Sequence, residues 1–156
     1  MKELKFPLLN KDQIEVRVGQ VSAKGCTLLL YKTSRTDAEI LDKVVGQGNW
    51  QKRFYTLQGV GIGDQVRSIV VCSVGIYDED KHEWISKEDT GTESNTEKEK
   101  GLASDSFKRA CFNWGIGREL YTAPFIWVGA EHCTALSESN GKAKCFDSFA
   151  VQKIVI

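Results

Sequence analysis

The spacing of hydrophobic residues predicts two strands and a helix in the first third of the chain. Residues 14–18 alternate apolar and polar side chains as a half-buried strand does, and the apolar run at residues 26–31 predicts a second strand. Ser34 and Asp37 follow at capping-box spacing, which predicts the start of a helix. Its apolar stripe consists of Ala38, Leu41, Val44 and Val45. The helix should end at a pair of glycines, Gly46 and Gly48.

Three further strands are predicted next, joined by short turns. Residues 49–57 and the β-branched run at 66–77 predict two strands, with a glycine-rich turn at 59–65 between them. A polar turn at 78–82 then leads to a third strand at 83–89. Strands this close in sequence favour an antiparallel meander.

A long helix is predicted over residues 97–117, with Thr96 and Glu99 at capping-box spacing and Gly115 and Gly117 at its end. At about 100° per residue, one arc of roughly 100° should pack against the meander. It contains Ala103, Phe107, Ala110, Cys111 and Trp114. The opposite side carries Asp105, Lys108, Arg109 and Phe112.

These elements predict an α+β fold: a helix, a three-stranded antiparallel β-meander, a long helix packed on the sheet, and extra C-terminal strands. Residues 125–130 and 146–156 are the C-terminal strands, joined by a polar turn at 137–144, and they should complete the sheet or its edge. We expect a single domain over residues 1–156, with its core at about 14–128 and edge strands at 129–156.

Composition is that of a soluble globular protein, with 41% hydrophobic and 27% charged residues. No apolar run approaches the roughly 20 residues that span a bilayer, and the N-terminus has no apolar signal core. The five cysteines are odd in number and form no C-x-x-C pair, so neither a disulfide framework nor a zinc site is indicated. We therefore expect a cytoplasmic protein without a metal or other cofactor.

The formal charge of zero hides an uneven distribution. Residues 78–105 contain ten acidic and four basic residues, whereas residues 1–35 contain seven basic and three acidic ones. The net charge therefore does not indicate a nucleic-acid-binding protein, but it is compatible with local basic patches on the surface. On the long helix, Phe112 lies outward beside Lys108 and Arg109, where an uncovered aromatic ring is unusual. We therefore expect it to contact another segment of this chain, a second subunit or a nucleic acid. A structural salt bridge, for example to Asp105, is the competing role for the two cations.

Other functions are also compatible with parts of the sequence. Asp64 followed by Glu79, Asp80 and Lys81 loosely matches a metal-dependent nuclease, but these acids fall in predicted turns, where a metal site lacks rigid support. There is no G-x-x-x-x-G-K-[ST] loop for an ATP-driven recombinase. Helix, three strands and helix is also the topology of a double-stranded RNA module, although the second helix here begins among acids. A purely structural oligomer is the remaining alternative.

The run "SDSFKRACFNWGIGR" (residues 104–118) closely resembles Rad52-type single-strand annealing proteins, in the form carried by bacteriophages and prophages. Residues 28–50 and 90–101 resemble the same family, and the likeness covers roughly residues 14–128. The resemblance implies an α+β core with a bent meander, and subunits assembled into rings or helical arrays. It also implies ATP-independent binding and annealing of single-stranded DNA in recombination and repair, with other recombination proteins as further candidate partners.

Residue by residue, the resemblance implies DNA contacts for Lys108 and Arg109, which match the family's backbone-binding pair. Arg35 matches a groove arginine, and Lys100 matches a helix lysine with a phosphate role. Phe112 stands where eukaryotic members carry another arginine, which makes it a candidate subunit contact. From the residues themselves, Lys52 and Arg53 interleave cations with aromatics, as single-strand grooves often do; a solvated strand edge is the alternative.

Overall fold

The computed structural model describes residues 4–22, 24–60, 66–91, 98–132, 136–139 and 142–145. Its contacts divide the chain into two compact units. The meander unit comprises Met1–Leu8 and Thr33–Arg118, and the terminal-strand unit comprises Leu9–Lys32 and Glu119–Ile156. The predicted α+β class is confirmed, because helices and antiparallel sheets follow one another in the expected order.

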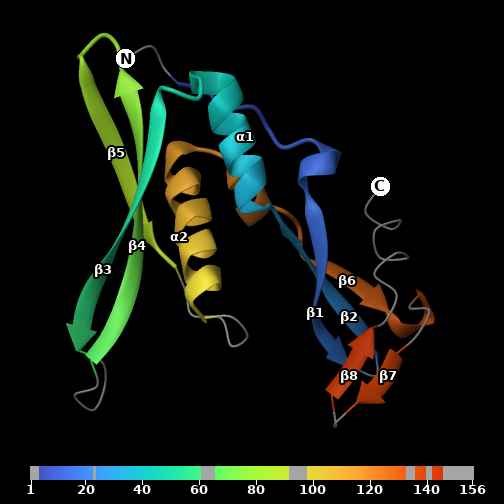
Figure 1. Cartoon of the computed structure of the whole chain (residues 1–156). Coiled ribbons are helices and arrows are strands. Elements are labelled where there is room, and N and C mark those ends of the chain that lie inside the picture. The colour runs from blue at the N-terminus through green and yellow to red at the C-terminus, as the bar shows by residue number, and fades with distance from the viewer. Residues whose placement is uncertain are drawn as a thin grey trace. The chain divides into compact units, whose positions relative to one another are not determined.

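The meander unit contains the predicted three-stranded sheet, with strand order β3-β4-β5 (Figure 1). Its strands are β3 (Trp50–Val60), β4 (Val66–Asp78) and β5 (Glu83–Thr90). The turn between β4 and β5 is tight, with His82 at a φ of 54°. Residues 61–65 of the predicted glycine-rich turn lie outside the described part of the chain.

Helix α1 (Ser34–Val45) begins one residue earlier than the capping prediction placed it. The N-cap is Thr33, whose Oγ1 accepts a hydrogen bond from the Thr36 amide at 3.2 Å. The prediction of Ser34 as the cap was therefore wrong, because two hydroxyl residues stand side by side and only backbone geometry chooses between them. The predicted stop is confirmed: Gly46 has a φ of 89° and its N–H binds the Asp42 carbonyl at 3.1 Å.

Helix α2 (Lys98–Trp114) lies along the sheet on the same side as α1 (Figure 1). Four of the five residues in the predicted apolar arc are buried: Phe107, Ala110, Cys111 and Trp114. The indole N–H of Trp114 donates to the Val74 carbonyl of β4 at 2.8 Å, and the Phe107 ring stacks on Trp50 at 6.1 Å. These contacts fix the rotation of α2 on the sheet.

The end of α2 follows the predicted glycine signal. Gly115 has a φ of 105°, and its N–H binds the Phe112 carbonyl at 2.9 Å. The Ile116 N–H binds the Cys111 carbonyl at 3.1 Å, which completes a Schellman motif. Because a side chain is strained at such a φ, glycine is required here. Thr96, the predicted cap at the other end, lies outside the described residues.

The terminal-strand unit has its own antiparallel sheet, with strand order β1-β2-β6. Its strands are β1 (Glu15–Ser22), β2 (Gly25–Tyr31) and β6 (Ile126–Gly129). Short 3-10 turns and a hairpin complete the described elements: η1 (Lys11–Gln13), η2 (Arg118–Tyr121), η3 (Ala130–His132), β7 (Leu136–Ser139) and β8 (Lys142–Cys145).

The C-terminal strands differ from the sequence prediction in two respects. The strand at 126–129 adds to β2 of the other sheet rather than to the meander, since Cys26 pairs with Val128. The stretch predicted as a polar turn, residues 137–144, forms most of β7 and β8, so that prediction was wrong. Antiparallel strands also contain polar residues, so polar composition alone does not distinguish a hairpin from a turn. The predicted strand at 146–156 lies outside the described residues.

Candidate nucleic-acid interface

Lys108 and Arg109 lie on α2 directly after the buried ring of Phe107, and both are half-buried. A structural ion pair is present at Arg109, and it crosses from the helix to strand β5. Nε of Arg109 is 3.1 Å from Oδ1 of Asp89. The side chains are 39% and 23% exposed, respectively, so the pair lies at an accessible edge of the helix–sheet junction. Such a partly exposed pair contributes at most about 1 kcal/mol to stability.

The carboxylate of Asp89 receives hydrogen bonds from three groups. Besides Arg109, the Thr90 amide donates to Oδ1 at 2.8 Å, and Nδ2 of Asn113 lies 3.1 Å from Oδ2. Nδ2 of Asn113 also donates to the Glu88 carbonyl at 2.9 Å. Asp89 is thereby held in one orientation, and it holds the guanidinium of Arg109 at the edge of the sheet.

Lys52 and Arg53 lie on opposite faces of the meander, because successive side chains of a strand point to opposite sides. The ammonium of Lys52 is 4.6 Å from the centre of the Phe107 ring, on the face that α2 covers. Arg53 is on the other face, where it lines a shallow groove of about 260 Å³ with Tyr55 and Glu88. The two cations, grouped together in the sequence prediction, therefore cannot line one continuous face of the sheet.

In the groove beside Arg53, the Tyr55 hydroxyl donates to Oε2 of Glu88 at 2.6 Å. This hydrogen bond to a carboxylate raises the pKa of Tyr55, because removing the proton would place two negative groups together. The groove thus combines one cation with a hydroxyl–carboxylate pair, so it is less basic than its arginine alone indicates.

Two cations that sequence reasoning missed, Lys87 and Arg118, meet at the C-terminal end of α2. Arg118 donates from Nε to the Phe112 carbonyl at 3.0 Å and from Nη2 to the Asn113 carbonyl at 2.9 Å. Nζ of Lys87 donates to that same Asn113 carbonyl at 2.9 Å. Val74 of β4 pairs with Lys52 on one side and with Lys87 on the other. Paired residues point to the same face, so Lys87 lies on the helix side of the sheet, as Lys52 does. The position of Lys87 beside the helix follows from the pairing of the strands, which the sequence alone does not give.

Phe112 is half-buried, and the structure supplies one of the three kinds of partner considered for it. The guanidinium carbon of Arg118 is 5.6 Å from the centre of the Phe112 ring. A later segment of the same unit therefore contacts this side chain, at a distance typical of a cation–π interaction.

Arg35 and Lys100 complete the set of predicted contacts. Arg35 is exposed in the first turn of α1, whereas Thr36, Asp37, Ile40 and Leu41 are buried. The structure thus turns Arg35 away from the packed side of its helix. The backbone of Lys100 is helical, in the first turn of α2, but its side chain is not among those described.

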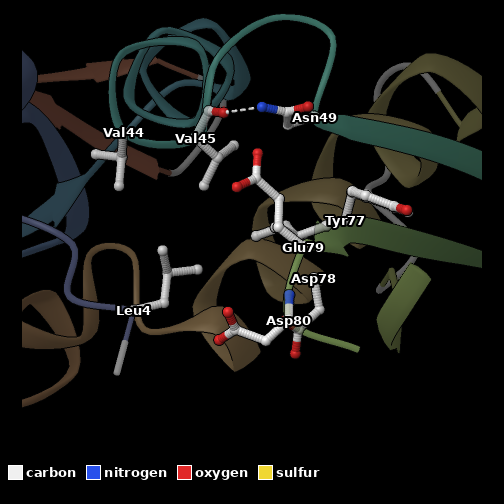
Figure 2. A pocket seen from close by; sticks show the side chains of 9 residues that line it. Leu4, Val44, Val45, Asn49, Tyr77, Asp78, Glu79 and Asp80 are labelled. Atoms are coloured by element: carbon white, nitrogen blue, oxygen red, sulfur yellow. Dashed lines mark hydrogen bonds between the residues drawn. The ribbon is translucent and has the colours of Figure 1, made fainter. Parts of the chain in front are cut away.

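The acids of the nuclease alternative line a hollow of about 360 Å³ beside the β4–β5 turn. Asp78, Glu79 and Asp80 lie on one side of it and Leu4 and Val44 on another (Figure 2). Asp64, the other acid of that alternative, is outside the described residues. Within the described ranges, no group of three or more His, Cys, Asp or Glu is placed to hold a metal ion.

The structure describes the side chains of Cys26, Cys72 and Cys111, and all three are buried. Burial raises the pKa of Cys72 to about 11, because the thiolate would lose its hydration. None of the helices in the described ranges has the length and apolar character that a membrane crossing requires.

Comparison with known protein families gives a match that covers most of the chain. The model of the Rad52/22 family double-strand break repair proteins matches residues 2–136. No curated protein and no solved structure shows significant similarity. The match includes both helices, the meander and the basic residues described above. This chain therefore belongs to the Rad52/22 family of double-strand break repair proteins.

Proposed function

We propose that this protein binds single-stranded DNA and anneals complementary strands without ATP. Family membership gives it a role in DNA repair and recombination. The main support for single-stranded DNA binding is the position of Arg109. It follows Lys108 on α2, and Asp89 holds it at the accessible edge of the sheet. A guanidinium held in this way offers a prepared donor to a phosphate.

Annealing needs no bond to be made or broken by the protein. Lysine and arginine side chains that bind phosphates reduce the repulsion between two strands, and this affinity carries no sequence code. If the bases face outward, Watson–Crick pairing itself selects the complementary strand. The residues proposed to bind the backbone are Lys108, Arg109, Arg35, Lys100, and Lys52 or Arg53. We propose no catalytic residue and no cofactor.

We further propose that the subunits assemble into a ring or helical array, which would present many bases of one strand at once. The half-buried Phe112, whose ring also contacts Arg118, is the proposed subunit contact. The proposed setting is a phage or prophage recombination system in the cytoplasm of a bacterial host, as the resemblance of the long helix indicates. Sedimentation at micromolar concentration, with and without DNA, tests assembly; a monomer under both conditions would refute it.

The decisive experiment for the function mixes the protein with labelled single-stranded and duplex DNA, with and without ATP. We expect tight binding to the single strand, weaker binding to the duplex, and faster annealing of complementary oligonucleotides that does not change with ATP. A preference for duplex RNA or DNA would favour a double-stranded nucleic-acid module instead. Magnesium-dependent degradation that is lost in Glu79→Ala would establish the nuclease alternative.

A further inference from the structure

The C-terminal end of α2 brings two full positive charges to a single backbone oxygen. Nζ of Lys87 and Nη2 of Arg118 each lie 2.9 Å from the carbonyl oxygen of Asn113. Lys87 comes from β5 and Arg118 from the segment after the helix, so only the folded unit makes this juxtaposition. Both side chains are exposed, and an approaching ligand can reach them.

The charge at this point is not balanced by the groups that bind the two cations. Carbonyls at a helix C-terminus carry only about half an elementary negative charge in total. In the ranges that the structure describes, neither Lys87 nor Arg118 forms an ion pair with a carboxylate. Two like charges held this close repel each other, so an anion that bridges them is favoured.

Aromatic rings and backbone carbonyls hold both cations in place before any ligand arrives. The ammonium of Lys87 is 4.9 Å from the centre of the Trp114 ring, which is itself buried and fixed to Val74. The guanidinium of Arg118 lies over Phe112 while two of its nitrogens bind carbonyls. Side chains fixed in this way lose little further entropy when they bind.

We propose that Lys87 and Arg118 form a phosphate-binding site for the backbone of single-stranded DNA. This inference rests on the function proposed above and extends the binding surface beyond Lys108 and Arg109. Asn113 follows Arg109 by about one helical turn, roughly 6 Å along the axis of α2. The carbonyl that Lys87 and Arg118 bind therefore lies about one helical turn beyond Arg109. The Lys87–Arg118 pair combines a point charge with a planar fork of donors, both of which suit a phosphodiester.

The test removes both charges and keeps a polar side chain at each position. In Lys87→Gln/Arg118→Gln, the shorter amides do not replace the bonds of the two cations to the Asn113 carbonyl, so thermal melting first checks that the variant is folded. We expect uniformly weaker binding to single strands of any sequence, with the salt dependence lowered by up to about 1.4 log–log units for two lost contacts. Between about 50 and 200 mM salt, such a change makes the affinity loss roughly sevenfold larger at the lower concentration.

Two control variants separate this site from general effects of charge and folding. Lys87→Arg/Arg118→Lys keeps both charges and should retain the parent salt dependence. Lys43→Gln/Lys81→Gln removes two exposed charges of the same unit and should change the slope little. If the glutamine double variant does not melt cooperatively, the single variant Lys87→Gln is used instead, because Arg118 then keeps both of its hydrogen bonds to carbonyls. The expected decrease in the salt dependence is half as large for this single variant.

The outcomes distinguish this site from the function it rests on. If the parent protein does not bind single-stranded DNA, the proposed function fails. If the parent binds and Lys108→Ala/Arg109→Ala lowers the salt dependence, but the folded glutamine variant matches the parent, the function stands and the Lys87–Arg118 site is refuted.

Discussion

The carboxylate of Asp89 binds the guanidinium of Arg109, with Oδ1 3.1 Å from Nε, and so connects strand β5 to helix α2. The arginine that we propose to grip DNA thus already has an anionic partner within the chain. A phosphate must share Arg109 with Asp89 or displace it. The ion pair should therefore affect DNA affinity, although it contributes little to the stability of the fold.

Replacing Lys108 and Arg109 by alanine should weaken binding to single strands of every sequence alike. Each phosphate contact that is lost should lower the salt dependence by about 0.7 log–log units, because fewer counterions are released. Fluorescence anisotropy over a salt series measures this, and sedimentation checks that assembly survives. Parent-like affinity and annealing across the series would show that the pair does not contact DNA.

Replacing Asp89 by asparagine should strengthen binding to single-stranded DNA. The amide oxygen can still accept from the Thr90 N–H, but the negative charge that competes for Arg109 is gone. Because the pair is partly exposed, stability should fall by less than about 1 kcal/mol, which thermal melting measures. Weaker binding in this variant would mean that the positioning of Arg109 by Asp89 matters more for DNA binding than the competition between Asp89 and phosphate.

Lys52→Met and Arg53→Met should have different effects on DNA binding, because the two side chains lie on opposite faces of the sheet. We expect the salt dependence to fall in one variant and not in both. Lys52→Met should also cost about 0.5–1 kcal/mol of stability through the lost contact with the Phe107 ring. Equal changes in salt dependence for both variants would contradict a single groove on one face.

The Cys72 thiol should resist alkylation in the folded protein. Its pKa of about 11 lies two units above the ordinary value of 9.0, so at pH 8 the thiolate is about a hundredfold scarcer than in the unfolded chain. Because the folded-state pKa is raised, the associated stability is present below pH 9 and is lost as pH rises through 11. Site-resolved mass spectrometry after iodoacetamide treatment measures the rate; equal rates in native and denaturant-unfolded protein would refute the burial.

Local patterns determined the elements that carry the proposed interface. Apolar residues three and four positions apart specified the buried side of α2, and glycines at positive φ specified where both helices end, because these signals depend only on neighbours in the sequence. The same reasoning placed Arg109 outside the apolar arc. Local patterns could not distinguish Thr33 from Ser34 as the N-cap, because either hydroxyl can accept a hydrogen bond from an amide of the first helical turn.

Only the tertiary structure decided which charges meet. Asp89 and Arg109 are 20 positions apart, and Lys87 and Arg118 are farther apart still; each pair forms because β5 and α2 pack in one particular register. Strand alternation alone puts Lys52 and Arg53 on opposite faces of β3, but the packing of α2 decides that Lys52 is the one on the helix side. Side-chain pairing between distant segments follows from strand register and helix rotation, and both are fixed by packing of the whole core rather than by any local signal.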